Sequence, residues 1–481
     1  MRPASISRLA IRVCGTVLAF AFVHSAAHAE LPRAVAQALQ QARVPTSEVA
    51  FWSGPADGGQ ATWQHNAGTP FNPASVMKTL TTFAALDTLG PSYTWSTDAF
   101  VSAPIVNGTL RGDVILRGSG DPSLTWDRLE QLLRELRSRG LRDIQGDLVI
   151  DRSLFAAEPP AGADFDDQPL RAYNATPDAL LVNFKAISIR LSPGTAGTPM
   201  LATSVTPYSP LTIDSSVRTV AGACPDWRGG IKQQLDADGA GLRLTLSGQI
   251  AASCGERLLH LTVQDGLRMA GGVFRDLWQG LGGTWSGKVR EGSVPADAVR
   301  LANWQSPPLA DVVRDINKFS NNVMARQLYL TLGRRDGNGA ASNAASEQFM
   351  RDWLARQSLL LPGLVLENGA GLSRTERISA EGLASLLRTA WRSPRMPEFV
   401  ASLPVAGIDG TARRRFANQG SAGRAYLKTG SLNNVMSAAG YVLDSRNRWQ
   451  VFVMMVNGNN PERAETAMIQ AVEAVWRGPT Q

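Results

Sequence analysis

The sequence predicts an α/β chain of the α+β type, with an antiparallel sheet flanked by helices and with β-rich inserted domains. Near the C-terminus, apolar strands are predicted over 426–430, 437–443 and 449–456, followed by a helix over 462–476. Consecutive strands joined by short turns form an antiparallel sheet, on which a helix packs. Between about 95 and 300, short strands instead alternate with turns rich in Gly, Pro, Asn and Asp, which is typical of a β-rich insert.

The first 29 residues have the pattern of a secretory signal peptide. Three arginines precede an apolar run over 13–23, and Ala27-His28-Ala29 offers a small-x-small cleavage site. The run is far shorter than the ~20 residues that an uncleaved anchor needs to span a bilayer. We therefore expect residues 1–29 to be removed and the protein to be exported.

Residues 31–90 predict two short strands and one helix. The strands are expected over 48–52 and 61–65. A helix that starts near Ser75 and ends at Gly90 is predicted from apolar residues at spacings of three and four: Val76, Leu80, Phe83 and Ala84.

The rest of the chain predicts a mainly β insert followed by helices. Within 95–300 we expect one helix, near 127–140, and strands such as 242–247, with one subdomain nested in another. The helical period returns at about 305, with helices predicted over 309–318 and 323–332.

Composition and charge indicate a globular protein and do not favour nucleic acid as a partner. Hydrophobic residues make up 44% and charged residues 19% of the chain, which suits a large core. After loss of the signal, 45 basic residues face 41 acidic ones, a net charge of +4. This mild charge allows weak attraction to an anionic polymer and does not point to nucleic acid.

Two cysteines, Cys224 and Cys254, remain in the mature chain. An even count in an exported protein favours a disulfide between them. The alternative is a pair of buried thiols.

Several kinds of site lack the residues that they need. The mature chain has only His65 and His260, and neither lies in a recognisable motif for a Ser-His-Asp triad or a zinc site. No phosphate-binding glycine loop follows a strand and opens a helix. We expect no metal and no cofactor.

A lysine can activate a serine where histidine is absent. Ser75 and Lys78 lie three positions apart at the start of a predicted helix, so one turn brings their side chains to the same face. The free N–H groups at the helix start suit a developing oxyanion. Alone, this motif is weak, because Ser75 could be an N-cap beside a solvated lysine.

Two further triplets strengthen the interpretation. Ser320-Asn321-Asn322 lies between two predicted helices, and Lys428-Thr429-Gly430 ends a predicted strand. Each triplet alone could be a helix cap or a strand-end turn. Together and in this order, the three motifs form the set S-x-x-K, S-x-N and K-T-G of penicillin-reactive enzymes.

The sequence resembles the low-molecular-mass class C penicillin-binding proteins, the D-alanyl-D-alanine carboxypeptidase/endopeptidase family. In that family two extra domains lengthen the gap between the first two motifs, and here 245 positions separate Ser75 from Ser320. Nearly the whole mature chain takes part, with further matching stretches at 118–122, 146–151, 173–175, 368–374 and 428–432. The segment 367–371, Glu-Asn-Gly-Ala-Gly, departs from the family's more common Asp-Gly-Ser-Gly.

The resemblance implies a penicillin-binding, serine β-lactamase-like catalytic domain over 30–96 and 300–481. It further implies an inserted domain II over 97–173 and 255–299, and a nested β-rich domain III over 174–254. The expected partners are peptidoglycan peptides, with β-lactam antibiotics as covalent inhibitors. The expected location is the periplasm, with at most peripheral association with the membrane or the wall.

The resemblance also assigns roles to the motif residues. Ser75 would attack the D-Ala carbonyl with Lys78 as its base, and Ser320 and Asn322 would relay protons to the leaving amine and hold the substrate amide. Binding of the terminal carboxylate would fall to Lys428 and Thr429, beside Gly430, with support from Arg374. The backbone N–H groups of Ser75 and Ser431 would form the oxyanion hole.

The insert is expected to reach the substrate. The segment Phe165-Asp166-Asp167, ahead of Tyr173, resembles a family stretch that reaches from the insert toward the cleft. The resemblance implies that the Asp167 carboxylate pairs with the free amine of the wall's diamino acid. Tyr173 would line the same subsite. The alternative is that Asp166 and Asp167 form a solvated acidic turn.

Two other functions remain open at this point. One is a β-lactamase or esterase with the same triplets, although such enzymes lack the long insert. The other is a non-catalytic wall-binding protein that keeps the fold, although the triplets are intact.

Overall fold

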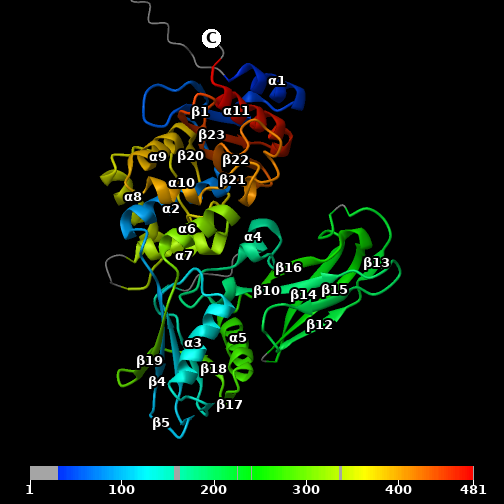
Figure 1. The fold of residues 1–481 in the computed structure, drawn as a ribbon, viewed down its shortest axis with the longest axis vertical. Helices are drawn as coiled ribbons and strands as arrows, with labels where there is room; N and C mark the ends of the chain where they lie inside the picture. Colours follow the sequence, from blue (N-terminus) through cyan, green and yellow to red (C-terminus); the bar gives the residue numbers. More distant parts are fainter. Residues whose placement is uncertain (1–30, 157–162, 225, 240, 335–338, 480–481) are drawn as a thin grey trace, which may run out of the picture.

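A five-stranded antiparallel sheet lies at the centre of the upper region in Figure 1. The computed structural model describes residues 31–156, 163–224, 226–239, 241–334 and 339–479; the expected signal peptide lies outside them. The sheet order is β2 (Trp63–His65), β1 (Val49–Pro55), β23 (Trp449–Asn457), β22 (Val435–Leu443) and β21 (Ala425–Leu432). The predicted C-terminal strands are confirmed, and β1 pairs with β23 to bring the two ends of the chain together.

Helices bury both faces of this sheet. One face packs against α1 (Arg33–Ala42) and α11 (Glu465–Arg477), and the other lies over α2 (Lys78–Leu89), α6 (Leu309–Phe319), α7 (Asn322–Gly333), α8 (Asn343–Arg356), α9 (Ala380–Arg392) and α10 (Met396–Ser402). Along β23, Val451 and Val453 face one core while Phe452 and Met454 face the other, as the period of two requires. A short pair, β3 (Pro70–Phe71) with β20 (Ile378–Ser379), lies outside the main sheet.

Residues 96–305 form the lower region. Its sheet order is β18 (Val289–Glu291), β9 (Leu148–Asp151), β7 (Val114–Gly118), β4 (Ser96–Val101) and β19 (Val299–Gln305), so the strands that enter and leave the region pair with each other. A smaller sheet joins β17 (Thr284–Trp285), β8 (Asp143–Ile144), β6 (Thr109–Leu110) and β5 (Ile105–Val106). The predicted helix is α3 (Trp126–Ser138).

The prediction of a single helix in the insert was wrong, because α5 (Gly266–Gly280) is a second one. Its glycines disfavour a helix in isolation. Tertiary packing requires them here: a Cβ on Gly271 would lie 2.3 Å from Val289, and one on Gly272 would lie 2.1 Å from Tyr208. The helix therefore forms because it packs closely, against its local propensity.

A β-rich arm projects to one side of the lower region (Figure 1). It contains β10 (Ala186–Ser192), β11 (Leu201–Ser204) and β16 (Arg257–Thr262) in one sheet, and β12 (Leu211–Ser215), β13 (Arg218–Val220), β14 (Ile231–Asp238) and β15 (Gly241–Ala251) in another. A disulfide joins Cys224 to Cys254. Because β10 pairs with β16, strand pairing crosses position 254, where the sequence suggested the end of the nested domain.

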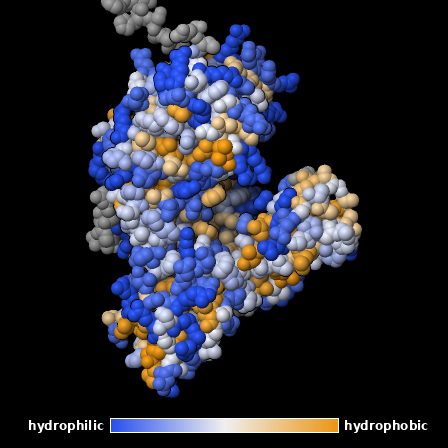
Figure 2. Space-filling view, in the orientation of Figure 1, coloured by the Kyte–Doolittle hydropathy of each residue, from blue (hydrophilic) through white to orange (hydrophobic). Residues whose placement is uncertain are grey.

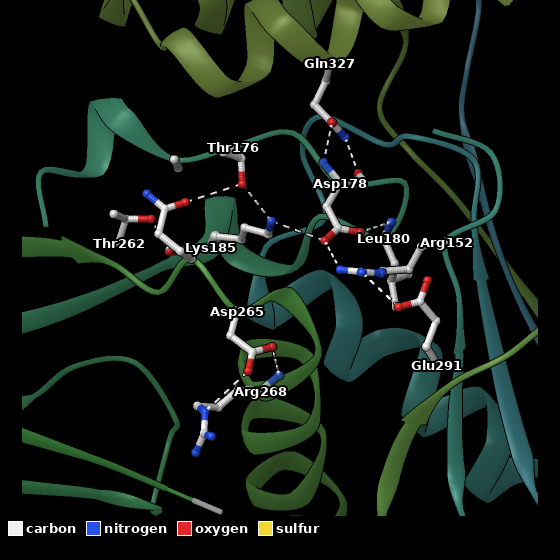
Figure 3. Close-up of polar contacts among 12 residues, drawn as sticks. Arg152, Thr176, Asp178, Leu180, Lys185, Thr262, Asp265, Arg268, Glu291 and Gln327 are labelled. Carbon is white, nitrogen blue, oxygen red and sulfur yellow. Dashed lines mark hydrogen bonds and ion pairs between the residues drawn. The ribbon is translucent and has the colours of Figure 1, made fainter. Parts of the chain in front are cut away.

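A buried polar network joins the insert to α7 (Figure 3). The side chain of Gln327 accepts from the Asp178 N–H (2.9 Å) and donates to the carbonyls of Asp178 (2.8 Å) and Gly120 (3.2 Å). The Asp178 carboxylate pairs with Arg152 (2.9 Å) and Lys185 (3.2 Å), both from the insert. The network thus fixes the insert against a helix of the upper region.

Within the part of the chain that the structure describes, no helix has both the length and the apolar character needed to cross a bilayer.

Candidate active site

The predicted motifs meet where the upper region faces the insert. Figure 2 shows the surface hollowed between the upper region and the arm, near the place where Figure 1 puts β21 and α4 (Ala163–Asp166). Side-chain hydrogen bonds join Lys78 to Ser75 and Asn322 in one group, and Lys428 to Ser320 in a second. Residues as far as 244 positions apart are therefore brought into direct contact.

Ser75 lies in a 3₁₀ turn over Ala74–Met77, directly before α2. Ala74 has φ +46°, a left-handed conformation that costs about 1–3 kcal/mol outside glycine. The turn is held by Asn72, which accepts from the Ala74 N–H (2.8 Å) and donates to the Ser373 carbonyl (2.8 Å). A fixed, strained turn thus presents the hydroxyl at the start of a helix, as predicted.

Lys78 is completely buried. Its Nζ donates to three oxygens, those of Ser75 Oγ (3.0 Å), Asn322 Oδ1 (2.6 Å) and the Ala370 carbonyl (2.5 Å). Burial holds the pKa of Lys78 well below its ordinary value, and the Lys428 charge lowers it further. A lysine in this state can lose its proton and accept one from Ser75.

Ser320 and Asn322 lie at the junction of α6 and α7, as expected. Ser320 ends α6 in a left-handed conformation (φ +58°), and Asn321 caps α7 by accepting from the Met324 N–H (3.2 Å). Asn322 is the first residue of α7, and its Nδ2 donates to the Tyr173 carbonyl (3.2 Å). The insert therefore takes part in orienting the amide that contacts the buried lysine.

Lys428, Thr429 and Gly430 lie inside β21 and do not end it, because the strand continues to Leu432. Lys428 is fully buried and donates to Ser320 Oγ (2.9 Å), and burial lowers its pKa to about 7. Thr429 donates to Thr411 Oγ1 (2.7 Å), a partner that the sequence did not indicate.

Gly430 permits the strand to approach the Ser75 turn. A Cβ at this position would lie 2.9 Å from both the Pro73 carbonyl and the Ser75 nitrogen. The face of Gly430 that lacks a side chain therefore meets the turn that carries Ser75. Ser431, the next residue, is exposed on the edge strand.

Arg374, Asp167 and Tyr173 occupy the insert side of the site. The Arg374 guanidinium lies 4.5 Å from the centre of the Phe165 ring and donates to the Phe165 carbonyl (3.2 Å). Asp167 is exposed and left-handed (φ +56°). Arg374 therefore contacts the segment that precedes Asp167. Tyr173 is linked to Asn322 through the Tyr173 backbone carbonyl.

Asp166 is a residue whose structural role the sequence missed. It accepts from the Tyr173 hydroxyl (2.6 Å) and from Asn174 Nδ2 (2.9 Å). Burial, together with this bond, raises the pKa of Tyr173 to about 12. The proximity of Asp166 to Tyr173-Asn174 in the sequence was the available signal, but only the fold shows which of the two adjacent acids turns inward.

A family model described as D-Ala-D-Ala carboxypeptidase 3 (S13) matches residues 31–477. The chain belongs to this family. The resemblance found in the sequence is thereby confirmed. The D-alanyl-D-alanine carboxypeptidase of an Actinomadura species is 29% identical over 399 residues, which cover 80% of this chain and 73% of the relative. The D-alanyl-D-alanine carboxypeptidase DacB of Haemophilus influenzae is 26% identical over 399 residues, 82% of each chain.

A solved structure of this carboxypeptidase fold is similar along almost its entire length. Penicillin binding protein 4 (dacB) from Haemophilus influenzae superposes with a TM-score of 0.77 at 23% identity, covering 92% of this chain and 99% of that one. The likeness confirms the mixed α/β fold class with several antiparallel sheets.

Proposed function

We propose that this chain is a serine D-Ala-D-Ala carboxypeptidase and D,D-endopeptidase that cleaves peptidoglycan stem peptides and cross-links through an acyl-enzyme on Ser75. The observation that carries the proposal is the 3.0 Å contact between Ser75 Oγ and the buried Nζ of Lys78, whose hydrogen bonds all go to neutral oxygens. A desolvated lysine without a carboxylate partner is suited to act as a base near neutral pH.

In acylation, Ser75 Oγ attacks the carbonyl carbon of the penultimate D-Ala, and Lys78 takes the hydroxyl proton. The carbonyl oxygen becomes an oxyanion, which the backbone N–H groups of Ser75 and Ser431 stabilise. The start of α2 adds its dipole to this site. A strained turn that already presents the hydroxyl supports this step, since little reorganisation remains.

The amine leaves when a proton reaches its nitrogen. Ser320 is placed to deliver it, because its hydroxyl lies 2.9 Å from Lys428 Nζ and can be reprotonated from there. Asn322 holds the substrate amide, and Thr429 with the charge of Lys428 binds the terminal carboxylate. Water then attacks the ester carbon on Ser75. Its proton passes through Ser320 to Lys428, and the proton held by Lys78 returns to Ser75 Oγ as that oxygen leaves, which restores the enzyme.

Labelled penicillin tests the proposal directly. We expect a stable adduct that peptide mapping places on Ser75, and release of D-Ala from a wall pentapeptide. Ser75→Ala should lose both while its thermal unfolding stays unchanged. An adduct on a different serine would overturn the assignment.

The same experiment separates the two alternative functions. Rapid turnover of the drug would indicate a β-lactamase, and no adduct on the folded protein would indicate a wall-binding protein. The three intact motifs and the long insert favour the peptidase over both.

We further propose that the acidic segment of the insert selects the free amine of the wall's diamino acid. Asp167 is exposed beside Asp166, whose carboxylate already holds Tyr173, and Arg374 ties the preceding Phe165 to the catalytic side. If Asp167→Asn lowers kcat/KM for a substrate with the free amine but not for its acetylated form, the role is supported. Equal effects on both substrates would make Asp167 a surface acid.

The proposed setting is the periplasm, after removal of residues 1–29. β-Lactam antibiotics are proposed as covalent inhibitors, and peptidoglycan peptides as substrates. We retain the proposed catalytic domain over 30–96 and 300–481, with domain II and domain III inserted between its two parts.

A further inference from the structure

Glu376 is a fully buried carboxylate close behind the active site. One of its oxygens, Oε1, accepts three backbone N–H groups in succession: those of Glu367 (3.2 Å), Asn368 (3.1 Å) and Gly369 (3.2 Å). Three donors converging on one oxygen stabilise a negative charge there. The carboxylate therefore fixes the backbone of the loop over 367–371.

This loop is in direct contact with the catalytic lysine. The Ala370 carbonyl, one peptide beyond the three N–H donors, accepts from Lys78 Nζ at 2.5 Å. Gly369 is fastened to α2, because its carbonyl accepts from Thr81 Oγ1 at 2.7 Å. The loop also supports the nucleophile, since a Cβ on Gly371 would lie 1.8 Å from the Ala74 carbonyl and 2.8 Å from the Ser75 nitrogen.

The charged groups around Lys78 act in opposite directions. Burial and the Lys428 charge, from β21, lower the pKa of Lys78, and the Glu376 charge raises it. Glu376 itself faces Glu367 on its own loop and Tyr329 on α7, and burial raises its pKa. Among the described residues, the second carboxylate oxygen, Oε2, and the Tyr329 hydroxyl are buried without a hydrogen-bond partner.

We propose that Glu376 is a positioning residue for acylation, which shapes the loop that holds Lys78 and sets the pH range in which Lys78 acts as the base for Ser75. The inference rests on the proposed function. Glu376 supplies a negative charge near Lys78, whereas the hydrogen bonds of Lys78 Nζ go to Ser75, Asn322 and Ala370. A charge that acts without an ion pair tunes the lysine and does not lock it as an ammonium ion.

The test is the pH dependence of acylation by labelled penicillin. Glu376→Gln keeps an oxygen for the three N–H donors and removes the charge. We expect the acidic limb of its second-order acylation rate to move to lower pH by about half a unit or more, because the free base of Lys78 becomes easier to form. A purely structural role would lower the rate at every pH and leave the limb in place.

Glu473→Gln is the matched control. Glu473 is also a buried glutamate that accepts a backbone N–H, that of Ser421 (2.8 Å), but it lies on α11 against the opposite face of the sheet. The acidic limb of the acylation rate of Glu473→Gln should coincide with that of the wild type. An unmoved limb in Glu376→Gln, or a shift to higher pH, would overturn the inference.

Two further measurements cover the remaining outcomes. If Glu376→Gln does not fold, the pair Glu376→Asp and Glu376→Asn isolates the charge, and equal limbs in that pair would refute the proposal. If the wild type takes no penicillin, the proposed function fails instead. Carbon NMR of selectively labelled lysine then still shows whether Glu376→Gln lowers the pKa of Lys78. The Lys78 signal is assigned by its loss in Lys78→Met.

Discussion

Two buried lysines with different partners distinguish the upper region from the insert. Lys185, in the insert, is 4% exposed and pairs with the Asp178 carboxylate at 3.2 Å (Figure 3). Lys78, in the upper region, is 0% exposed, and its bonds go to the neutral oxygens of Ser75, Asn322 and Ala370. The two lysines are similarly buried, but only Lys185 has a carboxylate in contact with its Nζ.

The physical difference lies in the protonation state that each environment favours. Burial lowers the pKa of both lysines, but at Lys185 the Asp178 charge opposes the shift. A paired lysine remains a cation that stabilises its neighbours, whereas an unpaired one readily becomes a neutral amine. The comparison teaches that Lys78, the proposed base, differs from Lys185 less in burial than in having no carboxylate in contact with its Nζ; Glu376 acts on it without contact.

The largest expected effect comes from exchanging each lysine for methionine. Lys78→Met should lower the acylation rate by about 10²–10⁴-fold, the usual contribution of a general base, with unfolding unchanged or shifted upward in temperature. Lys185→Met should do the opposite, with near-normal acylation by the folded fraction and reduced stability. Labelled penicillin and thermal unfolding measure the two readouts, and similar phenotypes for both variants would break the comparison.

Lys428 provides a pH test of the unpaired environment. Its folded pKa of about 7 lies below the ordinary value of 10.5. Between these pH values the unfolded chain binds more protons, so unfolding free energy should rise with pH, by up to about 5 kcal/mol from this group. Below pH 7 the lysine is protonated in both states and contributes no slope.

The measurement is denaturant unfolding of the wild type and Lys428→Met from pH 7 to 10.5. The difference between them removes the contribution of other titrating groups. A constant difference across this range would mean that Lys428 keeps its proton in the folded protein.

The paired environment can be tested by removing its anion. Asp178→Asn leaves Lys185 and Arg152 without the carboxylate that they share, and breaking a buried ion pair costs about 3–5 kcal/mol. We expect the unfolding free energy measured with denaturant to fall by this amount. Asp98→Asn is the control, at a carboxylate whose arginine partners are largely exposed. A loss below about 1 kcal/mol would show that the network contributes little.

The smallest expected effect on catalysis comes from the disulfide of the arm. Reducing the Cys224–Cys254 bond should leave penicillin acylation unchanged and destabilise the arm by about 3–4 kcal/mol, a loop-closure figure that depends on the model. Thiol titration of the unreduced, denatured protein should find no free thiol from this pair. Two titratable thiols would contradict the bridge.

Much of the upper region was predictable because its signals are local. The strands that became β21, β22 and β23 show as apolar runs between turns, and α6 and α7 show the helical period. The second insert helix, α5, was missed because its glycines lower local propensity, while their benefit appears only against Val289 and Tyr208.

The sequence by itself determined three local motifs: a serine and a lysine one turn apart, a Ser-Asn-Asn junction between two helices, and a Lys-Thr-Gly strand. These are local patterns, since spacing along a helix or strand fixes which side chains share a face. Only the tertiary structure decided the partners, such as Ser320 for Lys428, the Tyr173 carbonyl for Asn322, and Glu376 behind Lys78. These contacts join distant segments, and whether a buried charge has a counter-ion depends on how their surfaces pack.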